Sequence, residues 1–177
     1  MGLAALPDGG PRVVPVTVTL VPGSGGLHLA GPADPTLEEA AQVARSVALG
    51  WTAAREALAG RDARGGGGGD GGRRLRGGPR WGSPCCWRCS PRAPGARSRR
   101  GCAPRGEITL RGLLLPLSGL EEWVAAAAGA GMRTLIVPAA NGEDVAALPA
   151  ERRRRLAIAA VPGVDAAVRA ALGAEAR

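Results

Sequence analysis

The sequence predicts an α+β fold in a chain of one domain's length. Three observations indicate it. Residues 13–20 form a β-branched run typical of a well-buried strand. Residues 37–58 have the apolar spacing of a helix, and short strand patterns near residues 134–137 and 156–161 lead into a helix pattern over 164–172. Strands and helices therefore mix along the chain.

The first helix has clear signals at its beginning. Thr36 or Asp34 can accept hydrogen bonds from the free N–H groups of its first turn. Glu38 and Glu39 place negative charge where the helix dipole favours it. We therefore expect this helix to run from Leu37 to about Leu58.

The second half of the chain alternates strands and helices. Ile108 to Leu117 predicts a strand, and Leu120 to about Ala128 predicts a helix. Gly129 or Gly131 can end that helix, because glycine accepts the left-handed conformation common after a helix. The remaining elements are two short strands, 134–137 and 156–161, and a final helix, 164–172. The arginine run 152–155 is expected on the solvated face of a helix.

The segment 62–105 differs in composition from the rest. From Arg61 to Arg105 there are 12 arginines and two aspartates, which gives a net charge of +10, while the rest of the chain carries −2. Runs of glycine and arginine offer little apolar surface to bury. Ordering each residue costs about 1–2 kcal/mol of backbone entropy. We therefore expect this segment to be disordered.

One stretch resembles a known family. Residues 106–117, Gly-Glu-Ile-Thr-Leu-Arg-Gly-Leu-Leu-Leu-Pro-Leu, lead through Ser-Gly-Leu-Glu-Glu-Trp at 118–123 into an alanine-rich helix. A strand at 133–138 and the motif Asn-Gly-Glu-Asp at 141–144 follow. This order is similar to the C-terminal proteolytic domain of Lon, the ATP-dependent serine protease. From Gly106 to the end the resemblance is continuous.

A second block near the N-terminus supports the resemblance. Residues 1–4 look like the first strand of the Lon domain, and 22–31 resemble its P-G-x-G turn with the strand after it. Residues 37–44 are similar to its helix M-K-E-S-A-Q-A-A. Residues 62–105 match nothing in the family. The resemblance therefore implies a Lon proteolytic domain, of the ribosomal protein S5 domain 2-like type, in which a disordered insert replaces the central strand and helix. The expected parts are 1–61, 62–105 and 106–177.

The resemblance also locates the catalytic residues of the family. Lon uses a Ser–Lys dyad, in which a lysine of lowered pKa removes the serine proton. By spacing, Arg80 stands at the serine position, 27 residues before Glu107, and Trp123 stands at the lysine position. Arg105 replaces the threonine of the family's T-G-E motif, while Glu107 is retained. The chain contains no lysine. We therefore expect no catalytic residue, and the most ordinary role for Trp123 is to fill space on its helix.

The segment 62–105 is also consistent with a shifted reading frame. Moving the frame by one base permits G-P-S-L-G-V and an apolar helix near residues 78–88, which looks like the family's G-P-S-A-G-V region. Arg80 then falls at the serine. This shift would restore a serine but not the lysine at Trp123. The nucleotide sequence of codons 62–105 tests the idea.

Other sites are weaker alternatives. Ser118 or Ser24 with His28 and a carboxylate would imitate a Ser-His-Asp triad, although a single histidine is usually structural. Cys86 and Cys89, with Cys85 and Cys102 nearby, give only one ligand pair of a zinc site. The turn at 23–26 lacks the lysine of a phosphate loop. We expect no metal, cofactor or ATP binding, and the ATPase module of the family is absent from the sequence.

The function predicted first is a Lon-type serine protease domain that has lost its dyad. The alternatives are an Arg/Gly-rich protein that binds RNA weakly through 61–105, and a non-catalytic partner of Lon-like protomers, which form hexamers. No run reaches the roughly 18 apolar residues of a membrane helix, and no secretory signal is evident. The family implies an intracellular protein in the cytoplasm, mitochondrion or peroxisome, and the compartment stays open.

Overall fold

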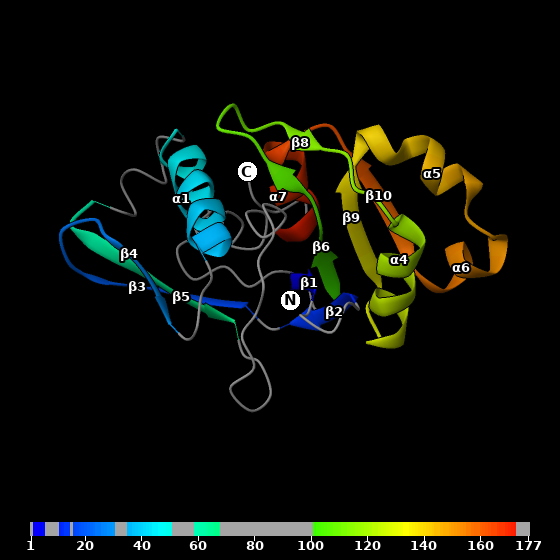
Figure 1. The fold of residues 1–177 in the computed structure, drawn as a ribbon, viewed down its shortest axis with the longest axis horizontal. Coiled ribbons are helices and arrows are strands. Elements are labelled where there is room, and N and C mark those ends of the chain that lie inside the picture. Colours follow the sequence, from blue (N-terminus) through cyan, green and yellow to red (C-terminus); the bar gives the residue numbers. More distant parts are fainter. Residues whose placement is uncertain are drawn as a thin grey trace.

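The computed structural model describes residues 2–5, 11–14, 16–30, 35–50, 59–67 and 101–172. Helices and strands alternate within these ranges (Figure 1). The mixed α and β composition agrees with the predicted fold class. Arg80 and most of the Gly/Arg-rich segment lie outside the described residues.

A three-stranded parallel sheet forms the centre of the C-terminal half. Its strands are β6 (Cys102–Pro104), β9 (Thr134–Pro138) and β10 (Ala157–Val161), in the order β10-β9-β6. The last four residues of β9 are all buried. A parallel strand covered on both faces is expected to be apolar throughout, and the sequence Thr-Leu-Ile-Val-Pro meets this requirement.

Two helices cover opposite faces of this sheet. Leu135 and Val137 of β9 pack in the cluster that contains α4 (Leu120–Gly129), whereas Ile136 packs in the cluster that contains α7 (Val164–Leu172). Successive side chains of a strand point to opposite faces. The sheet is therefore the middle layer between α4 and α7, and these two clusters are the core.

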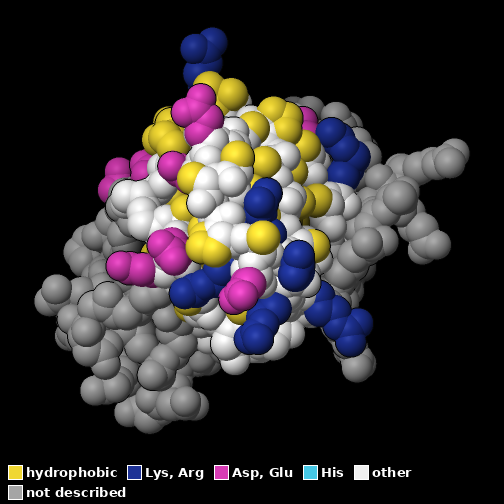
Figure 2. Space-filling model, turned by 90° about the vertical axis from the view of Figure 1, so that its right-hand side faces the viewer, with side chains coloured by type: hydrophobic (Ala, Val, Ile, Leu, Met, Phe, Trp, Pro, Cys, Tyr) yellow, Lys and Arg dark blue, Asp and Glu magenta, His cyan; other side chains and the backbone are white. Residues whose placement is uncertain are grey.

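The connection from β9 to β10 contains three short helices that run along one side of the molecule. They are η3 (Ala139–Asn141), α5 (Gly142–Ala147) and α6 (Ala150–Arg155). Figure 2 shows this side, with arginine and acidic side chains interspersed over it. Arg152 on α6 lies 3.8 Å from Glu121 on α4, an exposed pair worth roughly 0–1 kcal/mol. Arg153 to Arg155 are exposed, as predicted for a solvated helix face.

A second sheet lies at the other end of the molecule. It consists of β3 (Val16–Pro22), β5 (Arg61–Gly67) and β4 (Leu27–Ala30), in the order β3-β5-β4. β5 is antiparallel to β3 and parallel to β4. Helix α1 (Pro35–Leu49) connects β4 to the segment before β5, and its Ala44 and Ala48 join the cluster around α7.

Two hairpins complete the described structure. β1 (Gly2–Ala5) pairs with β2 (Pro11–Val14), and β7 (Glu107–Ile108) pairs with β8 (Leu114–Leu115), both antiparallel. β1 forms where the first strand was expected.

Three predicted elements differ from the structure, and a fourth begins where it was expected. The strand expected over 13–20 is divided between β2 and β3, with Pro15, which has no N–H to donate to a ladder, between them. The strand expected over 108–117 is wrong: the chain reverses at Gly112, whose φ of +76° suits glycine, and forms the β7–β8 hairpin. Helix α1 ends at Leu49, and residues 51–58 lie outside the described ranges. The helix expected from Leu120 begins as predicted.

The predicted disorder of 62–105 is wrong at both ends of that segment. Residues 61–67 form β5, the central strand of its sheet, and residues 102–104 form β6. β5 carries few apolar side chains, but its backbone pairs with β3 on one edge and β4 on the other. The two ladders satisfy its N–H and C=O groups, which composition alone does not reveal.

Candidate functional site

The N-terminus of α4 carries the position that the sequence assigned to the family's lysine. Gly119 precedes the helix in a left-handed conformation, with φ of 65°, and glycine accepts this conformation without steric cost. Leu120, Trp123, Val124 and Ala127 follow at helical spacing and are buried. The indole of Trp123 is 5% exposed and packs among the leucines of this cluster.

Arg105 lies over the Trp123 ring. Its guanidinium carbon is 3.9 Å from the ring centroid, and the residue is only 2% exposed. Its backbone N–H donates to the carbonyl of Ile136 at 2.8 Å, which extends the ladder of β6 beside β9. A buried cation is costly unless it is compensated, and the negative face of an indole is one source of compensation. The pair joins the two positions at which the sequence analysis expects the family's threonine and lysine.

Asn141 fixes the loop that leads into α4. Its Oδ1 accepts the N–H of Leu117 at 2.9 Å, and its Nδ2 donates to the carbonyl of the same residue at 2.8 Å. Nδ2 also donates to Asp144 Oδ2 at 2.8 Å. Asn141 is 1% exposed, so its two bonds to Leu117 are protected from water, whereas its bond to Asp144 is only partly buried. The side chain thus pairs both backbone polar groups of Leu117, three residues before α4 begins.

The sequence analysis singled out two further site positions, Glu107 and Arg80. Only Glu107 lies within the described residues. Glu107 is half-buried in β7, where it stands opposite Leu115 in the hairpin. Arg80 lies outside the described residues. Of the four positions, Arg105 and Trp123 are therefore in contact, and the expected serine position lies outside the described residues.

Neither the indole of Trp123 nor the guanidinium of Arg105 is a proton acceptor. An indole N–H only donates, and a guanidinium stays protonated at any useful pH. The aromatic face can stabilise a neighbouring cation, which is the role that Arg105 gives it. The pair is therefore suited to packing, and not to removing a proton from an alcohol.

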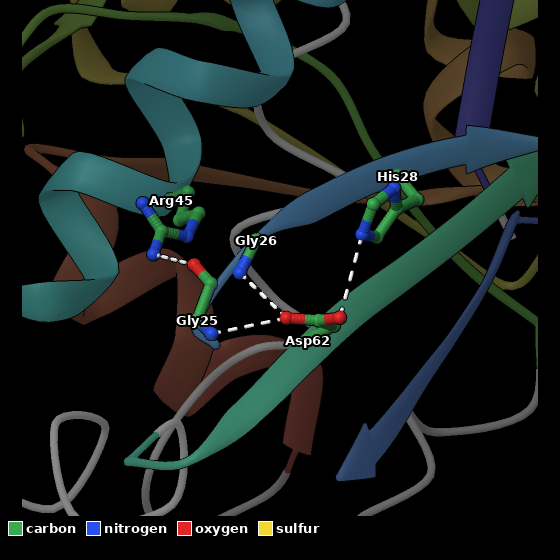
Figure 3. A network of polar contacts seen from close by, with 5 residues as sticks. All are labelled: Gly25, Gly26, His28, Arg45 and Asp62. Atoms are coloured by element: carbon green, nitrogen blue, oxygen red, sulfur yellow. Dashed lines mark hydrogen bonds and ion pairs between the residues drawn. The ribbon is translucent and has the colours of Figure 1, made fainter. Parts of the chain in front are cut away.

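Of the triad that the sequence offered only as a weak alternative, the contact between His28 and a carboxylate is present (Figure 3). His28 Nε2 lies 3.4 Å from Asp62 Oδ2, so β5 supplies the carboxylate. The other oxygen of Asp62 accepts the N–H groups of Gly26, at 2.7 Å, and Gly25, at 3.0 Å. Among the described residues, no serine hydroxyl bonds to the His28 ring. The carboxylate thus holds the β3–β4 turn against β5.

The same bonds perturb the titration of Asp62. The hydrogen bond from Gly26 is the largest cause that lowers the pKa of this carboxyl, and the bond from Gly25 and the nearby His28 add to it; partial burial opposes them. Arg45 of α1 donates to the carbonyl of Gly25, which ties the turn to the helix as well (Figure 3). A side chain on Gly23 would collide with the Asp62 carboxylate, so this turn requires glycine there.

Of the four cysteines considered for the weak zinc alternative, one lies in the described structure. Cys102 is a buried free thiol in β6, while the other three cysteines lie outside the described residues. The described residues bring no three His, Cys, Asp or Glu side chains together as a metal site would require. The same part of the chain has no helix whose length and apolar character suit a membrane crossing.

Sequence reasoning missed three of these features. They are the stacking of Arg105 on Trp123, the hydrogen bonds of Asn141 to Leu117, and those of Asp62 to the turn at 25–26. The motif Asn-Gly-Glu-Asp at 141–144 was a signal for the second. The other two join residues 18 or more positions apart, and no local pattern marks them.

The family model of the Lon protease (S16) C-terminal proteolytic domain matches residues 76–174 of this chain. This match begins well before Gly106, so the prediction that 62–105 resembles nothing in the family is wrong from residue 76 onward. Arg80, Arg105, Glu107 and Trp123 all lie inside the matched range.

Whole Lon proteases are also similar to parts of the chain. Lon protease of Chloroflexus aggregans is 45% identical over 78 residues, which are 44% of this chain and 10% of that protein. Lon protease 1 of Myxococcus xanthus is 46% identical over 74 residues, 42% of this chain and 9% of that protein. Lon protease of Geobacter metallireducens is 31% identical over 181 aligned positions, 97% of this chain and 21% of that protein.

The chain thus spans about a tenth to a fifth of the length of these relatives. The family model covers more than half of the chain, and the long alignment reaches almost all of it. The parallel sheet between α4 and α7 lies within the matched range. This chain belongs to the family of Lon protease C-terminal proteolytic domains.

Proposed function

We propose that this chain is a non-catalytic form of the Lon-type serine protease domain, derived from an ATP-dependent peptidase. One observation carries the proposal. The residue at the family's lysine position is Trp123, which is buried under the Arg105 guanidinium at 3.9 Å. A Ser–Lys mechanism needs a neutral amine at that point to take the serine proton.

No other side chain of this chain supplies that amine, because the 177 residues contain no lysine. A neighbouring arginine is no substitute, since its pKa is too high for it to act as a base. Removing one member of a catalytic Ser-His-Asp triad in another protease costs about a millionfold in kcat. We expect a loss at least as complete here, because Arg80 also stands at the serine position.

The finer architecture belongs to the same proposal. We infer an S5 domain 2-like arrangement, with 1–61, 62–105 and 106–177 as its successive parts. The strands at 61–67 and 102–104 lie at the two ends of the middle part, whose second portion falls within the range of the family model. The reading-frame hypothesis applies to this interval. Transcript sequence across codons 62–105 supports it if the shifted frame encodes the Ser-containing motif and an apolar helix, and rejects it otherwise.

A casein degradation assay tests the loss of activity. The purified chain is expected to leave casein intact with or without ATP, while an active Lon protease digests it in parallel. Degradation by the chain that disappears on substitution of one of its own residues would contradict the proposal.

Assembly with Lon-type protomers is a second candidate. Leu113 and Leu115 on the β7–β8 hairpin are 55% and 38% exposed, and exposed apolar side chains are typical of contact surfaces. Co-purification with an active Lon protease, reduced by Leu113→Asp, supports this role. The RNA prediction concerns residues 61–105, which lie mostly outside the described ranges, and no described contact favours it.

A further inference from the structure

A cavity of about 480 Å³ lies away from the Arg105–Trp123 pair. Three elements surround it: the C-terminal turn of α1, the turn between β7 and β8, and the first turns of α7. Small-molecule sites are commonly about 300–1,000 Å³ in volume. The cavity is thus large enough for a ligand the size of a short peptide end.

The walls of the cavity are fixed by backbone contacts around Gly112. Its carbonyl accepts the N–H of Val164 at 3.1 Å, and its N–H donates to the carbonyl of Thr109 at 2.9 Å. The hydroxyl of Thr109 accepts the N–H of Leu113 at 3.1 Å. Val47 of α1 is the nearest side chain that a Cβ built on Gly112 would meet, at 3.7 Å, so the turn lies beside α1 and is bonded to α7. The cavity is therefore part of the folded chain and does not depend on a ligand to form.

The lining combines charge with apolar surface. Arg111 and Arg169 contribute guanidinium groups, and neither forms an ion pair among the residues that the structure describes. Asp165 contributes the single carboxylate of the lining. Val47, Leu110 and Pro162 supply apolar surface.

We propose that this cavity binds the C-terminal end of a peptide that finishes in an aliphatic residue. Guanidinium groups bind carboxylates with charge-assisted, often bidentate hydrogen bonds, so Arg111 and Arg169 suit the terminal carboxylate. Asp165 accepts the N–H of a peptide bond, which a bare inorganic anion does not possess. The apolar lining receives the aliphatic side chain. This inference does not rest on the proposed loss of catalysis.

N-acetyl-Leu-Leu with a free carboxylate is a suitable probe, and the same dipeptide with a C-terminal amide is its matched control. Isothermal titration calorimetry on the full chain is expected to show saturable binding of the acid, with the amide about tenfold weaker or more. Inorganic phosphate is expected to compete poorly. Equal binding of acid and amide, or equally effective phosphate, overturns the proposal.

Substitution of single arginines tests whether the dipeptide acid binds in this cavity. Arg111→Gln and Arg169→Gln are each expected to weaken the acid about tenfold, whereas Arg153→Gln on the exposed face of α6 leaves it unchanged. Thermal melting checks that each variant is folded. If one of the two cavity variants does not fold, the test relies on the other. A loss for Arg153→Gln equal to that for the cavity variants assigns the binding to general positive charge and overturns the proposal.

Discussion

The guanidinium of Arg105 stacks on the indole of Trp123, with 3.9 Å between its central carbon and the ring centroid. Arg105 ends the β6 side of the parallel sheet, and Trp123 belongs to the first turns of α4. The negative face of the indole offsets part of the cost of burying the cation, and the guanidinium covers that face of the ring.

Replacing Trp123 with alanine is expected to destabilise the fold by about 3–5 kcal/mol, since it opens a cavity in the core. It also removes the aromatic face under Arg105. Trp123→Phe keeps a ring in place and is expected to cost less. Chemical denaturation measures both.

Leu113→Ala is the control for the two Trp123 variants, because Leu113 is a large apolar residue that is 55% exposed. It is expected to change stability by no more than about 0.5 kcal/mol. A Trp123→Ala variant that is no less stable than Leu113→Ala would show that the indole does not fill the core as described.

Asn141 is expected to matter more than its size suggests. Asn141→Ala leaves the N–H and C=O of Leu117 without their partner, and a buried unsatisfied group costs about 1–3 kcal/mol. Asp144 is exposed, and Asp144→Ala removes only its one bond with Asn141, which is expected to cost no more than about 0.5–1.5 kcal/mol. Equal midpoints of urea unfolding for the two variants would contradict the stabilising role of the two Asn141–Leu117 hydrogen bonds.

Asp62 is expected to make stability depend on pH in the acid range. Its folded-state pKa lies below the ordinary value of about 3.9, because the Gly26 and Gly25 N–H groups bind the ionised form. A lowered pKa means that the unfolded chain binds protons first as pH falls. The contribution is therefore present above about pH 4 and is lost as the pH falls through the folded-state pKa.

Asp62→Asn removes the titrating group. The difference in urea midpoint between wild type and this variant is expected to stay constant from pH 6 to about pH 4 and to shrink between about pH 4 and pH 2.5. Gln42→Ala, at an exposed position of α1 that carries no titrating group, is the control and is expected to show a constant difference. A difference for Asp62→Asn that stays constant over this range would refute the role of the carboxylate.

Two glycines give a contrasting pair. Gly112→Ala is expected to destabilise the chain by about 1 kcal/mol or more, because its φ is +76° and alanine is strained there. Gly129 is the last residue of α4, and a Cβ there meets no atom within 4 Å. Gly129→Ala is expected to stabilise by up to about 1 kcal/mol, since alanine is the better helix former. Thermal shifts of the same sign for both would contradict this backbone account.

The sequence predicted best the elements whose signals are local. The end of α4 is one example: the N–H of Met132 donates to Ala127 and that of Gly131 to Ala128, with Gly131 at φ of +69°. This is the Schellman arrangement that a glycine after a helix favours. The final helix, 164–172, agrees to the residue because its apolar face repeats regularly.

The failures have a common physical cause, which is dependence on distant partners. β5 has the composition of a flexible segment, yet it pairs with two strands more than 30 positions earlier. The apolar run after Glu107 suggested one long strand, while Gly112 and the Thr109 hydroxyl impose a turn. In the site, spacing identified position 123 correctly as a helix residue, but only the fold shows that Arg105 lies over it.

The most direct test of the central claim is the hydrolysis of a fluorogenic peptide by the purified chain, measured from pH 6 to pH 10. A Ser–Lys protease is expected to gain activity as its lysine loses a proton over part of this range. With Trp123 at that position, the account predicts no turnover above the rate without protein at any pH. Turnover that rises with pH and vanishes on substitution of a single residue of this chain would contradict it.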